Sequence, residues 1–319
     1  MKKTKIKWAD YTFNPWIGCT KISAGCAHCY AEEWDKRFHE GQHWGKGVER
    51  KRTCEKNWET MHTLNKQIEA LLNAEYVSDE SDRISPRVFC GSLCDWLDPE
   101  VPTDWLLDLL DLIRQTPLID WLLLTKRPGL WVERVMTVMR SIWLDKQRLE
   151  KYHDLLEWLH DWMGTEHCEM PGDPPAPPFN VWIGATIENQ EHIGRLRELR
   201  LIPAQTRFIS CEPLLSEINI LPYLIPSLGV DGQECGDFHW VICGGESGRN
   251  ARRMEADWAR GLRDQCVELG IPFFFKQWGD FEGNKSGEGK SRRKNECVKL
   301  DGIEWSEFPD SRRNVEVEQ

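Results

Sequence analysis

The sequence lacks several features that would each have assigned it to a class. No uninterrupted apolar run approaches the ~20 residues of a membrane-spanning helix, and the mean hydropathy is -0.56. The basic first residues, 1–11, are followed by no apolar stretch, so a secretory signal is not expected. Neither a Walker A motif nor G-x-G-x-x-G is present, which argues against a phosphate-binding loop of either kind. No internal repeat is apparent.

Positive charge is also in deficit. Lys and Arg number 41 against 52 Asp and Glu, which gives a formal net charge of -11. A chain this acidic is not expected to bind nucleic acid through its overall field. The basic stretch Arg292–Lys294 keeps a nucleic-acid enzyme as an alternative, although a solvated loop over Ser286–Asn295 is the simpler interpretation. The twelve cysteines, without a secretory signal, favour reduced thiols in the cytoplasm, and the lack of a long apolar run favours no membrane partner.

Seven short β-rich runs recur along the chain, and each ends in polar or glycine residues. Between them lie segments with apolar residues at helical spacing: Glu55–Ala74, Asp104–Ile113, Gln190–Leu201 and Ala256–Leu269. This alternation predicts an α/β fold with a buried parallel sheet. Seven strands favour a parallel βα barrel or partial barrel, and an open doubly wound sheet is the alternative. The predicted strands are Thr12–Gly18, Arg87–Gly91, Ile119–Thr125, Asn180–Thr186, Thr206–Cys211, Phe238–Gly244 and Ile271–Lys276.

The alternation is interrupted between the third and fourth predicted strands. Trp131–Met163 has the pattern of one or two amphipathic helices, and Met170–Pro178 (MPGDPPAPP) is a proline-rich spacer that cannot be helical. We interpret residues 131–178 as a helical insertion within a single domain that spans residues 1–280. Residues 281–319 are expected to form a C-terminal loop and extension.

Three closely spaced cysteines are the sharpest local feature. The segment CTKISAGCAHCYAE places Cys19, Cys26 and Cys29 at C-x6-C-x2-C on a loop after the first strand. Structural zinc normally takes four ligands, and a [4Fe–4S] cluster normally takes four cysteines, so three cysteines leave one iron open. The alternatives are a zinc site completed by a histidine and three buried thiols that bind nothing.

Polar residues follow the predicted strands, at the end where a βα barrel binds its ligands. Any one of them is typical of a helix cap or a polar loop, but six such positions around one barrel mouth predict a site. Lys126 or Arg127 is a candidate for binding a carboxylate or a phosphate. We expect one of the two to point into the barrel and the other to lie on its outer surface. The remaining candidates are Gly91, Ser92, Thr186, Glu188, Asn189, Ser210, Glu212, Gly244, Gly245, Glu246 and Lys276.

The triple cysteine resembles the motif of the radical S-adenosylmethionine (radical SAM) enzymes. Their usual spacing is C-x3-C-x2-C with an aromatic residue before the third cysteine, whereas here the first gap is six residues and His28 stands in the aromatic position. A closer resemblance covers nearly the whole chain. Segments in order, among them KWADYTFNPWIGCTKISAGCAHCYAE, WLLLTKRP and WVICGGESG, are similar to an uncharacterised phage and bacterial family regarded as radical-SAM-like.

The resemblance implies a [4Fe–4S] cluster on Cys19, Cys26 and Cys29, with S-adenosylmethionine on the fourth iron and a flavodoxin- or ferredoxin-type electron donor. The implied reaction cleaves the cofactor to methionine and a 5'-deoxyadenosyl radical, which abstracts a hydrogen atom from an unknown substrate. The alternative function is a phage-encoded binding module. In it, a structural zinc or iron–sulfur site holds the cysteine loop, and the protein docks a protein or nucleic-acid partner.

The same resemblance suggests roles for the strand-end residues. Gly91 and Ser92 occupy the position where radical SAM enzymes contact the methionyl amine of the cofactor, and Glu188 and Asn189 suit its ribose hydroxyls. Thr186, Ser210 and the pair Gly244 and Gly245 are further expected cofactor contacts, the glycines because they let main chain approach a ligand closely. By residue type, Glu212, Glu246 and Lys276 are the candidate catalytic groups.

Overall fold

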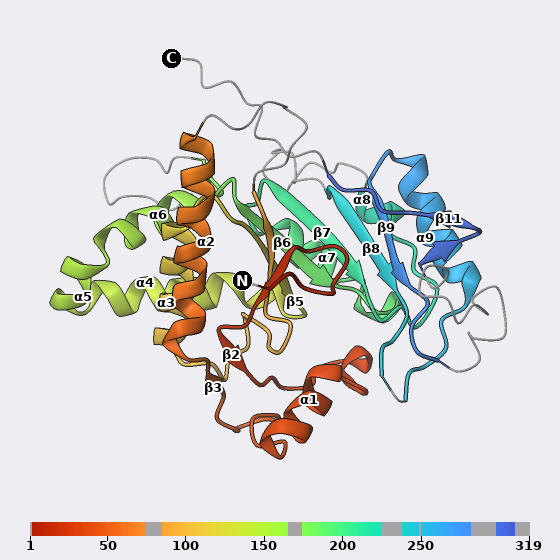
Figure 1. The fold of residues 1–319 in the computed structure, drawn as a ribbon, viewed down its shortest axis with the longest axis horizontal. Coiled ribbons are helices and arrows are strands. Elements are labelled where there is room, and N and C mark those ends of the chain that lie inside the picture. The colour runs from red at the N-terminus through yellow and green to blue at the C-terminus, as the bar shows by residue number, and fades with distance from the viewer. Residues whose placement is uncertain are drawn as a thin grey trace.

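The structure is a computed structural model, and it describes residues 2–74, 85–164, 174–224, 238–248, 250–281 and 298–309. At its centre is one seven-stranded sheet in which all neighbouring strands are parallel. The sheet is curled into a half-barrel with helices packed around it (Figure 1). Its strands are β1 (Tyr11–Phe13), β4 (Arg87–Cys90), β5 (Asp120–Thr125), β6 (Val181–Thr186), β7 (Thr206–Cys211), β8 (Trp240–Gly244) and β9 (Phe273–Gln277).

The strand order explains the curl. A doubly wound sheet reverses its strand order at a switch point, whereas here each connection adds the next strand on the same side. Right-handed crossovers then place the connecting helices on one face, and strand twist bends the other face into a concave surface. Within the described residues no ladder joins β1 to β9, so the barrel is partial. The predicted α/β partial barrel is confirmed, and the doubly wound alternative is wrong.

The helices bury the apolar stripes that the sequence pattern indicates. Helix α2, for example, buries Trp58, Met61, Leu64 and Ile68. Within the described part of the chain, no helix is long and apolar enough to cross a membrane. The helices are α1 (Tyr30–His39), α2 (Glu55–Asn73), α3 (Thr103–Gln115), α4 (Trp131–Trp143), α5 (Lys146–Lys151), α6 (His153–Met163), α7 (Arg195–Arg200), α8 (Leu221–Leu224) and α9 (Ala256–Glu268).

The segment between β5 and β6 is helical as predicted, but it contains three helices instead of one or two. Helices α4 and α6 both pack on α3. The Asp145 carboxylate accepts hydrogen bonds from the main-chain N–H groups of Gln147 and Arg148, and this N-cap separates α5 from α4. In the proline-rich spacer, residues 174–178 have no regular structure, and the remainder lies outside the described residues.

The first predicted strand, Thr12–Gly18, is two strands. Strand β1 belongs to the main sheet, whereas β2 (Trp16–Ile17) pairs antiparallel with β3 (Lys51–Arg52). Pro15 lies between them and has no N–H to donate to a ladder, so pairing is interrupted there. The break turns the chain away from the sheet just before the cysteine loop.

Aromatic side chains fill the concave face of the half-barrel. A partial barrel leaves a wide interior on its open side, and large rings occupy that volume. The N-terminal residues 2–10 lie across this face (Figure 1) and contribute Trp8, whose ring centroid is 4.6 Å from that of Phe89. This interior accounts for part of the 17 tryptophans in the sequence. The buried inner cluster consists of Trp8, Ala9, Phe89, Leu122, Trp182, Phe208, Trp240, Ile242 and Phe274.

A C-terminal segment lies along the last strand of the sheet. Residues 298–309 form the hairpin of β10 (Lys299–Leu300) and β11 (Ile303–Glu304) and then run beside β9. The N–H of Phe275 donates to the carbonyl of Trp305 at 2.9 Å, and the N–H of Glu307 donates to the carbonyl of Phe273 at 3.3 Å. The predicted basic loop Ser286–Asn295, with Arg292–Lys294, lies outside the described residues.

We predict that Gly184→Ala destabilises the protein, because Gly184 lies beneath a buried ring. A Cβ atom at this inward position of β6 would lie 2.3 Å from Cζ of Phe208, which is fully buried and has no room to move. Overpacking of this kind costs about 1–3 kcal/mol, measurable as a lower midpoint of urea unfolding. Gly261→Ala is the control, since that helical glycine has nothing within 4 Å of the added atom. Equal unfolding midpoints for the two variants would contradict the prediction.

Candidate functional site

A cavity of about 490 Å³ opens at the carboxyl ends of the strands. Its floor is apolar and includes Ile6, Trp8, Phe89 and Leu124, whereas its walls are polar. Strand alternation explains the change, because residues two apart on a strand face the same side. On these strands the earlier residues that face the barrel interior are apolar, and the last residues that face it, at the carboxyl end, are polar. The last inward positions that line the cavity are Lys126, Thr186, Ser210, Glu212 and Lys276.

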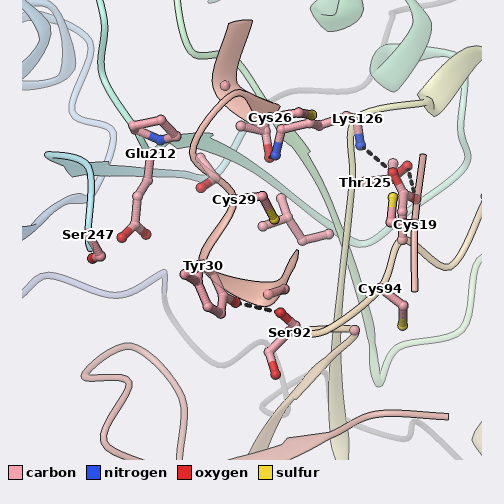
Figure 2. Close-up of a pocket in the computed structure, with 18 of the residues that line it drawn as sticks. Cys19, Cys26, Cys29, Tyr30, Ser92, Cys94, Thr125, Lys126, Glu212 and Ser247 are labelled. Atoms are coloured by element: carbon pink, nitrogen blue, oxygen red, sulfur yellow. Dashed lines mark hydrogen bonds between the residues drawn. The ribbon is translucent and has the colours of Figure 1, made fainter. Parts of the chain in front are cut away.

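The three cysteines line this cavity from the loop that leads into α1 (Figure 2). Cys19 follows β2, Cys26 closes a short 3-10 helix (Ala24–Cys26), and Cys29 is the N-cap residue of α1. A fourth cysteine, Cys94 from the loop after β4, lines the cavity as well. The cysteine loop and the strand ends therefore face one space.

Arg127 anchors the cysteine loop from β5. Its side chain is only 5% exposed, and its Nη1 lies 2.7 Å from Oδ2 of Asp95. The same guanidinium donates to Sγ of Cys19 at 3.5 Å and to the carbonyl of Thr20 at 2.6 Å. The expectation that Lys126 or Arg127 lies on the outer surface is therefore wrong, because both side chains turn inward. A buried guanidinium needs a carboxylate, and Asp95 supplies it on this side of the sheet.

A second buried ion pair, between Arg50 and Asp98, anchors the same loop. Arg50 and Asp98 have fully buried side chains, with 2.9 Å between Nη2 of the arginine and Oδ2 of the aspartate. Arg50 also donates to Oγ1 of Thr20 at 2.6 Å and to main-chain carbonyls of Gly45 and Val48 at 2.9 and 2.8 Å. The residue after Cys19 is thus held by two arginines.

Burial controls the ionisation of the thiols. It raises the pKa of Cys19 to about 12, an effect that Asp95 reinforces and Arg127 opposes. Burial likewise raises the pKa of Cys29 above its ordinary value. In the metal-free chain these two groups are therefore neutral thiols at pH 7. A metal that binds them must displace their protons.

The spread of the sulfur atoms bears on which metal centre they suit. A tetrahedral zinc with Zn–S bonds of ~2.3 Å brings its ligand atoms within roughly 4 Å of one another. In the described residues, the only group of three such ligand atoms within 4.8 Å is the exposed set His153, Asp154 and Glu157 on α6. The sulfurs of the cysteine loop are therefore more widely spread. A multi-iron cluster, in which each thiolate binds a different iron, does not require three sulfurs to lie that close together.

Glu188 lies behind the cysteine loop instead of in the cavity. Its fully buried carboxylate pairs with Arg195 at 2.7 Å and accepts the N–H of Gly25 at 3.3 Å. Burial alone would raise its pKa, but Arg195 and hydrogen bonds outweigh burial and hold the pKa below its ordinary value of 4.5. Asn189 caps the 3-10 helix Gln190–His192 by accepting the N–H of His192. That helix is separate from α7, so the predicted helix Gln190–Leu201 is also divided.

The two glycines after β8 lie outside the cavity lining. A Cβ atom on Gly245 would lie 2.0 Å from the carbonyl oxygen of Trp278, so this glycine lets the loops after β8 and β9 pack together. A Cβ atom on Gly244 would make ordinary contacts of 3.5 Å with Glu212 and Lys276. Packing of the two loops accounts for glycine at position 245, whereas the contacts of Gly244 would admit a side chain.

Glu246 lines the cavity, yet it is committed to an ion pair. Arg252 donates to its carboxylate at 2.8 Å, and His28 Nδ1 lies 3.2 Å from Oε2. Burial alone would raise the pKa of Glu246, but the hydrogen bonds from Arg252 outweigh it and lower the pKa. A carboxylate held ionised in this way is a poor proton donor. It instead joins the cysteine loop to the loop after β8.

Glu212 and Lys276 form an ion pair on the opposite wall, and both are mostly buried. Lys126 differs from them. Its Nζ donates to Oγ1 of Thr186 at 3.3 Å, and no carboxylate of the described residues forms an ion pair with it. Lys21 pairs with Glu32 at 2.6 Å, so among the lysines and arginines that line the cavity in the described chain, Lys126 is the cation left for an anionic ligand.

Gly91 and Ser92 lie at the edge of the cavity and join three elements. Gly91 has φ of +90°, a conformation that favours glycine, and its N–H donates to the carbonyl of Phe13 at 2.9 Å. Tyr30 donates its hydroxyl to the carbonyl of Ser92 at 2.6 Å, which ties α1 to this turn (Figure 2). Tyr30, Trp8 and Asp95 were not among the predicted site residues. Only Asp95, on the polar stretch after the second predicted strand, carried a signal in the sequence.

The fold and the site define a parallel partial βα barrel with a cysteine-bearing cavity at the carboxyl ends of its strands. The chain belongs to a family described as a protein of unknown function (DUF5131), whose model matches residues 3–309. Nearly the whole chain is covered, which confirms that it belongs to an uncharacterised family. No curated protein matches the chain, and no solved structure matches it.

We predict that Glu188→Gln flattens the acid side of the stability profile. Because folding lowers the pKa of Glu188 below 4.5, this carboxylate contributes stability that is present above that pH. The contribution is lost as pH falls through the folded-state pKa, with a slope of up to ~1.4 kcal/mol per pH unit for one proton. Urea unfolding at several pH values between about 5 and 3 measures the slope. The exposed Glu157→Gln is the control, and equal slopes in wild type and Glu188→Gln would refute the assignment.

Proposed function

We propose that the cavity holds a [4Fe–4S] cluster on Cys19, Cys26 and Cys29, that it binds S-adenosylmethionine, and that the protein is a radical SAM enzyme. One observation carries the proposal. Three thiols of one loop and the unpaired Lys126 face the same cavity at the carboxyl ends of a parallel half-barrel. When bound, the cluster and cofactor supply one-electron cleavage to methionine and a 5'-deoxyadenosyl radical.

The residues of the chain would provide binding and shielding. The Lys126 ammonium suits the cofactor carboxylate, and Thr186 holds that ammonium in place. The apolar floor of Trp8, Phe89 and Leu124 closes this end of the cavity to reactants carried by solvent. A closed pocket matters because a carbon radical is lost to dissolved oxygen or to the wrong hydrogen-atom donor when its pocket is open.

The wall opposite Lys126 is the proposed substrate side. The Lys276–Glu212 ion pair lines the cavity and offers both a donor and an acceptor to a polar substrate. Ser210 lies on β7, two residues before Glu212 and on the same side, and adds a hydroxyl to this wall. Glu246 is proposed to hold the cysteine loop through His28 instead of acting as an acid. Electrons would come from a flavodoxin- or ferredoxin-type donor in the cytoplasm.

The second candidate function is a zinc-binding module, and the three cysteines are the only feature that supports it. A cavity with room for a ligand next to the cysteines favours the cluster. A purely structural metal site is closed by its four ligands and needs no such cavity.

We predict that anaerobically reconstituted protein contains iron and sulfide and that Cys→Ala changes at Cys19, Cys26 or Cys29 abolish them. Each loss removes one of three ligands. Dithionite-reduced wild type should convert S-adenosylmethionine to 5'-deoxyadenosine, detected by mass spectrometry, and the three variants should not. Cys54→Ala is the matched control, because Cys54 is an exposed thiol outside the cavity.

Two results would contradict this assignment. Colourless wild-type protein with stoichiometric zinc would favour the binding module. Protein that carries iron and sulfide but yields no 5'-deoxyadenosine would be a cluster protein that is not a radical enzyme.

We predict that Lys126→Met weakens S-adenosylmethionine binding by at least about tenfold, which corresponds to ~1.4 kcal/mol, without lowering iron content. Methionine keeps the volume of the lysine stem but removes the charge that faces the cofactor carboxylate. Equilibrium dialysis with labelled cofactor measures the affinity. Lys36→Met serves as the control, since Lys36 pairs with Glu33 on the exposed side of α1. Equal affinities for the two variants would remove Lys126 from the binding site.

A further inference from the structure

The Arg127 guanidinium has an unusual set of partners for a residue expected to bind a ligand. Nη1 contacts both Oδ2 of Asp95 at 2.7 Å and Sγ of Cys19 at 3.5 Å, and Nη2 donates to the carbonyl of Thr20 at 2.6 Å. Every one of these partners is a group of the protein itself. Arg127 is therefore directed at the first cysteine of the triple, with both hydrogens of Nη1 and one of Nη2 taken by groups of the protein.

Asp95 fixes the direction of that guanidinium. Its Oδ1 accepts the hydroxyl of Thr125 at 2.7 Å and the N–H of Leu97 at 3.1 Å. Its Oδ2 accepts the N–H of Lys126 at 3.0 Å in addition to Arg127. Both oxygens are thus occupied by groups at the end of β5 and on the loop after β4. The planar fork of an arginine held in this way is pre-organised toward the sulfur.

In the described part of the chain, an arginine hydrogen bond reaches only one of the three thiols. Among the described residues, an arginine side chain hydrogen-bonds to Cys19, whereas the neighbour of the Cys26 sulfur is the uncharged hydroxyl of Ser23 at 3.7 Å. Lys126 acts on Cys29 through its charge alone, whereas Arg127 hydrogen-bonds to Cys19, so the three cysteines are electrostatically unequal. That inequality has a consequence only if the thiolates carry a redox-active centre.

We propose that Arg127, oriented by Asp95, is a positioning residue that hydrogen-bonds the Cys19 thiolate of the iron–sulfur cluster and raises its reduction potential. The inference rests on the proposed function. Reduction adds one negative charge to the cluster, and a buried cation next to a ligand sulfur stabilises the reduced form more than the oxidised form. Arg127 thereby makes the cluster easier to reduce, and it does not contact S-adenosylmethionine.

The test compares Arg127→Met, Arg127→Lys and wild type after anaerobic reconstitution. A redox titration followed by electron paramagnetic resonance gives the midpoint potential of each cluster. We expect Arg127→Met to lower the reduced fraction at a fixed potential about tenfold, a shift of ~59 mV for one electron. Arg127→Lys retains the positive charge but loses the planar set of N–H donors, so it should lower the midpoint potential by less than Arg127→Met does. Arg114→Met is the control, because it breaks an ion pair with Asp111 on α3, outside the cavity lining.

The outcomes separate this inference from the proposed function. Arg127→Met protein with wild-type iron content and a wild-type midpoint overturns the inference and leaves the proposed function intact. Wild-type protein that holds no cluster overturns both. If Arg127→Met does not fold, Arg127→Lys decides the matter: a midpoint below that of wild type supports the inference, and an unchanged midpoint opposes it.

Discussion

Two carboxylates on the loop after β4, Asp95 and Asp98, hold the guanidinium groups on which the cysteine loop rests. That loop lies between β2 and α1 and has little regular structure of its own. Arg127 and Arg50 supply the missing contacts, because both reach Thr20, the residue after the first cysteine. Removal of either carboxylate would leave a buried charge unpaired, which typically costs about 3–5 kcal/mol. The geometry of the cavity thus depends on two ion pairs that contact no ligand.

The sheet could be predicted from the sequence because each strand carries its own signal. Short apolar runs ending in glycine or polar residues mark all seven strands, and the period of two places Lys126, Thr186 and Lys276 on one side. The division of Thr12–Gly18 into two strands depends on Pro15, which could have been used as a signal. The presence of the cysteines in the cavity follows from their place after the first strand.

The partners of the charged residues could not be predicted in the same way. Arg50 and Asp98 are 48 residues apart, and His28 and Glu246 are 218 apart. No periodicity connects residues at such separations, so only the folded chain brings them together. Charged groups near strand ends therefore divide into those that face the cavity, such as Lys126, and those used to secure a loop, such as Glu188. The residue type alone does not distinguish the two.

The C-terminal segment beside β9 affects how readily two molecules associate through the edges of their sheets. An open half-barrel has two outer strands, and an outer strand with unpaired N–H and C=O groups is a template on which a second molecule can assemble. Main-chain bonds from Trp305 and Glu307 occupy that edge of β9. The C-terminal segment therefore protects this edge against edge-to-edge aggregation. A closed barrel needs no such segment, because every one of its strands is paired on both sides.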